Sequence, residues 1–301
     1  MMDEFSKLHP IVNFIYFVAI IGFTMFFMHP IFLGISLISA IIYVAYLQGL
    51  NGIKNNLLMS IYIIVMVVLV NMLVSSNGET ILFYIANKSI SLESIYYSIA
   101  SSVMFITVFM WFSCYNKIMT SDKFIYLFGK RFPSLSLIIS MVFRLIPNFK
   151  IQTKKIKDAQ KAMGRNFDEG TVLEKIKNGI KLISILITWA LENSIETVDS
   201  MKARGYGLDG RSNFSIYKFE KRDKIYLSIL LLLLGIIISG VFYGESYINY
   251  FPSFIMRDRN LYSYVIYTTY GILGIFPIII NVQRNFLLER DNNDKNRKCI
   301  F

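Results

Sequence analysis

Six stretches of this sequence contain no Asp, Glu, Lys or Arg and are about long enough to cross a membrane as helices. A helix needs roughly 17–25 mainly apolar residues to span the hydrocarbon core of a bilayer. The sequence therefore predicts an all-α integral membrane protein with about six transmembrane helices and the lipid bilayer as a partner. The stretches cover residues 11–28, 31–50, 57–78, 95–115, 225–243 and 261–283.

The composition excludes several other classes of protein. Charged residues make up 17% of the 301 residues and hydrophobic residues 54%, whereas soluble domains carry roughly 25% charged residues. Cys114 and Cys299 lie too far apart in the sequence to form a disulfide framework. His9 and His29 have no Cys near them, so we expect no metal site and no cofactor. No small-residue cleavage site follows the first apolar stretch, which we therefore expect to be a permanent helix.

Basic residues are concentrated between the fourth and fifth apolar stretches. Residues 117–224 hold 21 of the 31 Lys and Arg residues and 11 of the 20 acids, and so carry nearly all of the net charge of +11. With six spans, this segment lies on the same side as both termini, and the positive-inside rule assigns that side to the cytoplasm. Attraction to anionic lipid, about 1 kcal/mol per basic residue near the surface, accounts for many of these lysines.

These boundaries predict three domains. Residues 1–116 form the N-terminal transmembrane helices, and residues 225–301 form the C-terminal transmembrane helices with a cytoplasmic tail. Residues 117–224 form a central cytoplasmic and interfacial helical domain between them.

The central segment contains a short internal repeat at an offset of 41 residues. The octet DAQKAMGR at 158–165 aligns with DSMKARGY at 199–206, and four of the eight positions match. Each octet ends a predicted amphipathic helix. In the first helix Phe149, Ile156, Ala159 and Met163 share one face, and in the second Leu191, Ile195, Val198 and Met201 form an apolar stripe beside the acids Glu192, Glu196 and Asp199.

Both predicted helices stop at a glycine. Glycine adopts the left-handed conformation that closes many helix C-termini. Arg204 then lies where unsatisfied carbonyls favour a cation, between the small residues Ala203 and Gly205. A helix cap with a dipole-matched Arg explains one such copy. Two spaced copies favour a pair of surfaces that another protein approaches closely.

Two shorter apolar segments, 135–149 and 182–191, are too short to span a bilayer and are expected to be interfacial or packed against other helices. Pro147 is expected to kink or break the helix just before the first octet helix. Arg144 lies at the edge of the apolar segment, where either a functional role or snorkelling to the interface explains it.

These motifs resemble the transmembrane T component of energy-coupling factor (ECF) transporters over roughly residues 5–245. The resemblance rests on Ala203-Arg204-Gly205-Tyr206-Gly207 followed by 210–212 (GRS), on an Ala-x-Gly triplet about forty residues upstream, and on the RLIP sequence at 144–147. It implies a non-enzymatic scaffold in a prokaryotic cell membrane. Two coupling helices of such a scaffold dock on two ABC-type ATPase subunits, and its membrane part holds a substrate-binding S component for a vitamin or a transition-metal ion.

The resemblance makes Ala203, Arg204 and Gly205 the second ATPase-coupling triplet and Ala162, Met163 and Gly164 the first. Met163 stands where the family has Arg. Arg165 follows two residues later, so helix geometry points it elsewhere, and the sequence leaves open which of the two residues serves in the first motif. Arg144 and Pro147 become supporting residues of the coupling region. The span at 261–283 extends beyond the expected end of a T component.

Two other functions compete with the scaffold. A conventional ABC permease subunit also couples to ATPases, but it presents one coupling loop per half. A membrane-embedded enzyme needs carboxylates or His at membrane depth, and the sequence has no HExxH motif and no Gly-rich phosphate-binding loop. No feature indicates nucleic-acid binding. In the resembling family the S component determines the substrate, so this chain leaves the substrate open.

Overall fold

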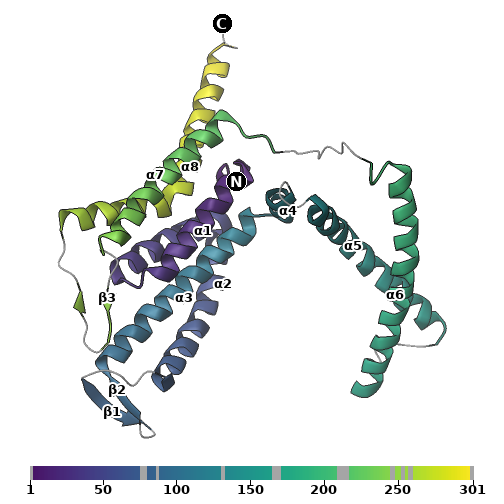
Figure 1. Cartoon of the computed structure of the whole chain (residues 1–301), viewed down its shortest axis with the longest axis horizontal. Helices are drawn as coiled ribbons and strands as arrows, with labels where there is room; N and C mark the ends of the chain where they lie inside the picture. Colours follow the sequence, from purple (N-terminus) through teal and green to yellow (C-terminus); the bar gives the residue numbers. More distant parts are fainter. Residues whose placement is uncertain are drawn as a thin grey trace. The chain divides into compact units, whose positions relative to one another are not determined.

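The computed structural model describes residues 3–74, 80–85, 88–129, 133–164, 171–208, 217–244, 248–251, 255–256 and 260–298. Nearly all of these residues are helical, which confirms the predicted all-α membrane fold (Figure 1). The chain divides into two compact units, one formed by Met1–Phe124 with Tyr217–Phe301 and the other by Ile125–Ile216. The three domain boundaries drawn from the sequence stay a prediction.

The first unit holds the apolar helices. Five segments are long and apolar enough to cross a membrane: Pro30–Gly49, Gly52–Asn71, Leu92–Ile118, Lys221–Phe242 and Leu261–Arg284. Helix α1 is apolar as well and has 17 residues, at the lower limit for a span. The helices are α1 (Pro10–Phe26), α2 (Pro30–Val74), α3 (Leu92–Ile118), α7 (Lys221–Phe242) and α8 (Leu261–Lys298), preceded by the 3-10 turn Phe5–Lys7.

Two short antiparallel hairpins join helices of this unit. Strands β1 (Ile81–Ile85) and β2 (Lys88–Ser91) lie between α2 and α3, and strands β3 (Ile248–Asn249) and β4 (Ile255–Met256) lie between α7 and α8. Tyr250, beside β3, donates a hydrogen bond from its hydroxyl to the Met28 carbonyl at 2.6 Å. The second hairpin is thereby fastened to the turn between α1 and α2.

Helix α2 contains two spans that reverse direction at Gly49. This glycine has φ 68° and ψ −172°, in the left-handed region that side chains disfavour. Gln48 and Asn56, on either side of the reversal, both donate amide hydrogen bonds to the Ser113 hydroxyl of α3, at 2.8 and 3.3 Å. Further along, Asn71 donates to the Ser101 hydroxyl at 2.7 Å. The second span therefore runs back along α3, and a single glycine replaces the predicted loop.

A buried hydroxyl cluster fastens four helices together. The Thr24 hydroxyl of α1 lies 2.9 Å from that of Ser36 on α2 and 3.1 Å from that of Tyr270 on α8. The Trp111 indole of α3 donates to Ser36 at 3.0 Å. Because an unpaired polar group is costly in an apolar core, this cluster fixes the relative register of the helices. The C-terminal span, which the sequence suggested to be an addition, is thus part of the core.

The N-terminal segment lies at the end of the bundle where α3 finishes and α7 begins. The Phe5 N–H donates to the Asn281 side chain of α8 at 3.0 Å, and the His9 N–H donates to Asp223 of α7 at 3.4 Å. The Lys123 ammonium donates to the Ser6 hydroxyl at 3.1 Å. One end of the first unit therefore gathers the N-terminal segment, the chain leaving for the second unit and the chain returning from it. Four of the six predicted membrane crossings precede the second unit, and this even number likewise puts the N-terminus and both connections to that unit on one side.

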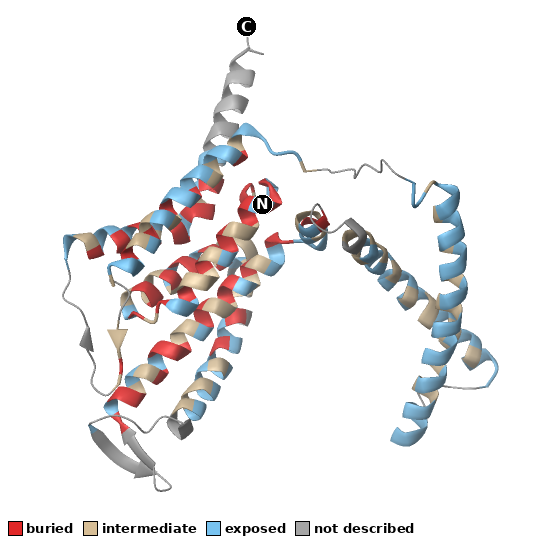
Figure 2. Cartoon of the chain, in the orientation of Figure 1, coloured by how far each residue is buried: buried red, intermediate tan, exposed pale blue. Residues whose placement is uncertain are grey.

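The second unit consists mainly of two long helices, α5 (Pro133–Ala162) and α6 (Val172–Ala203); α4 (Ser121–Gly129) leads into it. The rings of Phe149 and Trp189 meet edge to face, with 5.7 Å between their centroids, where α5 and α6 pack. Helix α6 buries none of its residues, and most of this unit is exposed or intermediate (Figure 2).

Pro147 neither breaks nor ends its helix, so the predicted break is wrong. Helix α5 continues through Pro147 from Pro133 to Ala162. Proline removes one backbone donor and crowds the preceding turn, a cost that the long helical segments on both sides absorb here. The apolar segment 135–149 and the first octet therefore belong to one helix. Likewise, the segment 182–191 is the middle of α6.

Candidate coupling site

The C-terminus of α6 is closed by a complete left-handed glycine cap. Gly205 has φ 83° and donates its N–H to the Lys202 carbonyl at 3.0 Å. The Tyr206 N–H reaches back to the Met201 carbonyl, also at 3.0 Å. These two bonds make up the Schellman motif, which satisfies carbonyls that a helix end leaves unpaired. Arg204 is the C-cap residue.

The C-terminus of α5 repeats this geometry 41 residues earlier. Gly164 has φ 77° and donates to the Lys161 carbonyl at 3.0 Å. The N–H of Met163 is shared between the carbonyls of Ala159 and Gln160, at 3.2 and 3.1 Å. The N–H of Arg204 is shared in the same way between Ser200 and Met201, at 3.2 and 3.1 Å. The expectation that both helices end at a left-handed glycine is confirmed.

The residues at both helix ends are accessible. Ala162, Gly164, Ala203 and Arg204 are exposed, and Met163 is 62% exposed. An apolar side chain so open to solvent is an energetic liability unless something covers it. Small residues on either side of Met163 and Arg204 allow another backbone to approach. Arg165 lies outside the described residues. The structure therefore does not decide whether Met163 or Arg165 serves in the first motif.

The predicted apolar face of the second helix is also open. Leu191, Ile195 and Val198 are 64%, 66% and 44% exposed. The stripe continues toward the N-terminus of α6 at three- and four-residue steps, which keep its members on one helix face. Its further members are Leu173, Ile176, Ile180, Ile183 and Ile187, all of them exposed. A surface helix of this kind needs a covering partner, either protein or lipid.

The sequence reasoning missed two features that position α5 and α6. The Phe149–Trp189 contact falls 14 residues before Met163 and 15 residues before Arg204, so each helix end projects about 21–23 Å beyond it. At the start of α6, the Glu174 carboxylate accepts a hydrogen bond from the Thr171 N–H at 2.8 Å. The sequence signals were one of only two Trp residues and the spacing T-x-x-E of a capping box.

The two predicted supporting residues lie within α5. Arg144 and Pro147 are both exposed, on a segment whose neighbours Val142, Phe143 and Ile146 are 48%, 43% and 43% exposed. A long Arg side chain among exposed apolar residues suits a membrane interface, where the guanidinium group can reach water. The structure does not bring Arg144 to either helix end.

Among the residues that the structure describes, no three of His, Cys, Asp and Glu are grouped so that they could hold a metal ion. The exposed acids Glu192, Glu196 and Asp199 follow one another along α6 without converging. Their spacing fits a stripe on one side of the helix. This arrangement presents charge to solvent or to a partner.

A family model described as CbiQ, cobalt transport protein, matches residues 5–216, more than two thirds of the chain. The chain belongs to this family. The match includes both glycine-capped helix ends and all of α5 and α6, and the predicted resemblance to T components is confirmed.

Curated relatives of this CbiQ-family chain carry the name energy-coupling factor transporter transmembrane protein EcfT. The protein of Lacticaseibacillus paracasei is 31% identical over 105 residues, 35% of this chain and 40% of the relative. That of Lactococcus lactis subsp. cremoris is 36% identical over 106 residues, 33% and 40% of the two chains. That of Thermotoga maritima is 25% identical over 259 residues, 83% and 92%. The first two alignments thus span less than half of the relatives' length.

Proposed function

We propose that this CbiQ-family chain is the transmembrane scaffold of an ECF-type importer. In this proposal the ends of α5 and α6 are coupling helices that dock on two ABC-type ATPase subunits. The helices of the first unit hold a substrate-binding S component in the membrane. ATP hydrolysis by the ATPases then drives the uptake of a vitamin or a metal ion that the S component captures.

The observation that carries this proposal is the repeated helix end. Two exposed ends, 41 residues apart, share a left-handed glycine that bonds back to a Lys carbonyl and a C-cap N–H shared between two carbonyls, and so offer two similar docking points. A pair of ATPase subunits, each with a groove for one helix end, matches that number. The names of the relatives support the same assembly, since they describe the transmembrane protein of an energy-coupling factor transporter.

The chemistry of the ends supports a mechanical role. Arg204 can form a bidentate, charge-assisted hydrogen bond with a carboxylate, while Met163 can fill an apolar pocket. Neither residue can act as a general base that activates water, since the thioether of Met163 is only weakly basic and the guanidinium of Arg204 stays protonated. We therefore assign ATP hydrolysis to the partners and force transmission to α5 and α6.

The membrane orientation in this proposal follows from charge. The structure gathers residues 5–9, 123 and 223 at one end of the first unit, and the Lys-rich helices α5 and α6 are joined to that end through the chain. The positive-inside rule places this end in the cytoplasm, where the ATPases are.

The test is co-purification followed by transport. The chain is co-expressed with ABC ATPases and small membrane proteins of its source organism, purified in mild detergent, and reconstituted into liposomes. We expect stoichiometric recovery of two ATPase subunits and one small membrane protein, and ATP-dependent substrate accumulation. Recovery of the folded chain without any ATPase would contradict the scaffold function.

A matched control separates docking from folding. Lys202→Ala removes a charge within the last turn of α6 without touching the C-cap, whereas Arg204→Ala removes the proposed contact. We expect the first variant to keep both ATPases and the second to lose affinity. Equal behaviour of the two variants would show that Arg204 has no specific partner.

A further inference from the structure

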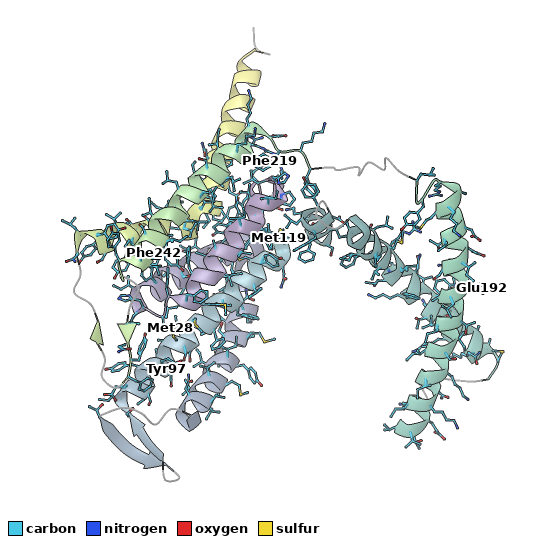
Figure 3. The ribbon with its side chains drawn as sticks, in the orientation of Figure 1. Met28, Tyr97, Met119, Glu192, Phe219 and Phe242 are labelled. Carbon is cyan, nitrogen blue, oxygen red and sulfur yellow. The ribbon has the colours of Figure 1, made fainter. Side chains whose placement is uncertain are left out.

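The second unit is joined to the first by two connections of the chain. Residues 119–124 lead from α3 toward it, and residues 217–220 lead back from it into α7. Figure 3 labels one residue of each connection, Met119 and Phe219, at the end of the bundle where Figure 1 marks the N-terminus. A pull on the second unit reaches the first unit through these two covalent connections.

A buried lysine binds the departing connection to the N-terminal segment, residues 3–9. Lys123 is 6% exposed, and its ammonium donates to the Ser6 carbonyl, to the Ser6 hydroxyl at 3.1 Å and to the Ile118 carbonyl at 2.9 Å. A lysine ammonium has three N–H donors, which match these three oxygen acceptors. One side chain therefore ties the end of α3 and the start of α4 to the N-terminal segment.

A buried carboxylate binds the returning connection to the other end of the same segment. The His9 N–H donates to Asp223 at 3.4 Å, and the His9 ring meets the Phe219 ring edge to face with 4.8 Å between their centroids. The second oxygen of Asp223 accepts from the Glu220 N–H at 3.0 Å, within the capping box of α7. Asp223 therefore holds the start of α7 and the end of the N-terminal segment together.

The N-terminal segment is itself anchored in the bundle. Phe5 and Leu8 are 0% and 2% exposed. The Phe5 N–H donates to the side-chain oxygen of Asn281 at 3.0 Å, and the Asn281 amide nitrogen donates to Asp3. Asp3 also accepts a hydrogen bond from the Tyr43 hydroxyl at 3.3 Å. The segment is thus fastened to α2 and α8 as well as to both connections.

From these contacts we propose that residues 3–9 are a clasp, which holds the two connections of the second unit at a fixed separation. Lys123 and Asp223 are its positioning residues. In the importer proposed above, on which this inference rests, the ATPases move the second unit. The clasp passes that movement to the bundle as a whole, because α3 and α7 cannot part where the second unit pulls on them.

A segment that only covers the end of the bundle does not explain where its polar contacts lie. Apolar burial such as that of Phe5 suffices for a cover, whereas burying a charged side chain costs free energy unless its hydrogen bonds are made. Lys123 lies two residues before Ile125, the first residue of the second unit, and Asp223 lies seven residues after Ile216, its last. The two buried charges therefore mark both boundaries of the second unit, as a clasp requires.

A matched pair of lysines tests whether the connections hold the segment. Lys123→Met removes the donor to Ser6 and keeps an unbranched side chain. Lys117→Met is the control, because Lys117 also lies near the end of α3 but donates to the Leu47 carbonyl of α2. Hydrogen exchange of residues 5–9 is measured on the full chain in detergent. We expect about tenfold faster exchange in Lys123→Met, the factor that one bond to a charged group supplies, and no change in the control.

Spin labels test whether the segment holds the connections. Thr120→Cys and Lys218→Cys place one label on each connection, at exposed positions. Cys299→Ser is included, and the remaining Cys114 is buried. The distance between the labels is measured by pulsed electron paramagnetic resonance on the chain alone and on its complex with ATPases, with and without ATP and vanadate. We expect one narrow distribution in every state of the wild type, and a broader one in the Lys123→Met complex with nucleotide.

Asp223→Asn tests the other end of the clasp and does not depend on Lys123. The two oxygens of Asp223 accept from the His9 and Glu220 N–H groups, and Asn replaces one of them with a donor. We expect faster exchange at His9 and the same broadening of the label distances. Lys224→Gln, at an exposed neighbouring position, is the control and should change neither measurement. This variant carries the test if Lys123→Met does not fold.

Two outcomes overturn the clasp. Unchanged exchange of residues 5–9 in both variants shows that the connections do not hold the segment. Faster exchange with unchanged label distances in the ATPase complex shows that the segment does not hold the connections. A wild-type chain that binds no ATPase refutes the proposed function instead, and the exchange measured on the chain alone distinguishes that failure from the first two.

Discussion

Met163 and Arg204 hold the same position in two copies of one helix-ending geometry. Each has its N–H shared between two carbonyls at 3.1–3.2 Å, and each is followed by a left-handed glycine that donates a 3.0 Å bond. Because an apolar and a cationic side chain occupy equivalent backbone positions, substitutions at the two sites compare an apolar contact with an ionic one. The first prediction uses that comparison.

Arg204→Ala should weaken ATPase association more than Met163→Ala. Removing one member of a desolvated ion pair costs about 2–5 kcal/mol, whereas complete burial of a Met side chain contributes roughly 1.5–3 kcal/mol. Titration calorimetry or biolayer measurements on the purified chain give both values. Binding through Arg204 should also loosen as salt rises, while binding through Met163 should not. A larger loss for Met163→Ala at every salt concentration contradicts the assignment.

The purified chain alone should not hydrolyse ATP. Its sequence contains no Gly-rich phosphate-binding loop, so turnover requires the ATPase subunits. Phosphate release is measured for the chain, for the ATPases and for the complex, with the detergent kept constant. Phosphate release that tracks the chain through successive purification columns contradicts the scaffold function.

Labelling from outside the cell should distinguish the β1–β2 hairpin of the first unit from helix α5 of the second unit. A cysteine at position 88, introduced as Lys88→Cys in β2, is expected to react with an impermeant maleimide in whole cells. Lys155→Cys on α5 should react only after the membrane is opened, because the positive-inside rule assigns that Lys-rich segment to the cytoplasm in the proposed topology. The reverse pattern would invert the topology.

Two glycines of α8 should respond differently to the same substitution. A Cβ added at Gly274 meets the Ser39 hydroxyl at 2.5 Å and its Cβ at 2.7 Å, whereas one added at Gly271 meets Ile35 at 3.6 Å. Gly274→Ala should therefore destabilise the bundle by about 1–3 kcal/mol through overpacking. Gly271→Ala should be neutral, or stabilising by up to about 1 kcal/mol, because Ala favours helix. Thermal unfolding in detergent compares them, and equal midpoints argue against close packing of α8 on α2.

Raising the pH should stabilise the wild type relative to Lys123→Met. Burial lowers the pKa of the Lys123 ammonium from 10.5 to about 8. Between these values the unfolded chain binds more protons than the folded one, so stability rises with pH across that window. From about pH 7.5 to 9.5 the wild type should gain about 1–2 kcal/mol over the variant. A flat difference between the two unfolding midpoints shows instead that Lys123 keeps an ordinary pKa.

Much of this fold could be predicted because its signals are local. A run without charged side chains marks a span, since each charge placed in hydrocarbon is costly and a long uncharged stretch is visible in the sequence itself. A glycine after an amphipathic stretch marks a left-handed cap, since only the residue's own sterics decide that conformation. For these reasons the sequence alone predicted the apolar helices and the helix C-termini at Gly164 and Gly205.

Features that depend on contacts between distant segments were not predicted. Pro147 was expected to kink or break a helix, yet α5 continues through it without a break and packs against α6. The reversal at Gly49 replaced an expected loop because Ser113 of α3 receives side chains from both sides of it. The crossing of Phe149 and Trp189 has no local signature, since an aromatic pair is defined only when two helices meet.

The sequence by itself determined that the chain is a bundle of membrane helices with two glycine-capped tips, one ending in Met163 and the other in Arg204. Both properties follow from hydration cost and backbone sterics, which act residue by residue. Only the tertiary structure decided that Tyr270 joins α8 to the core through Thr24, and that Phe149 of α5 meets Trp189 of α6. These depend on which surfaces pack, and packing is a property of pairs of segments that no single stretch of sequence contains.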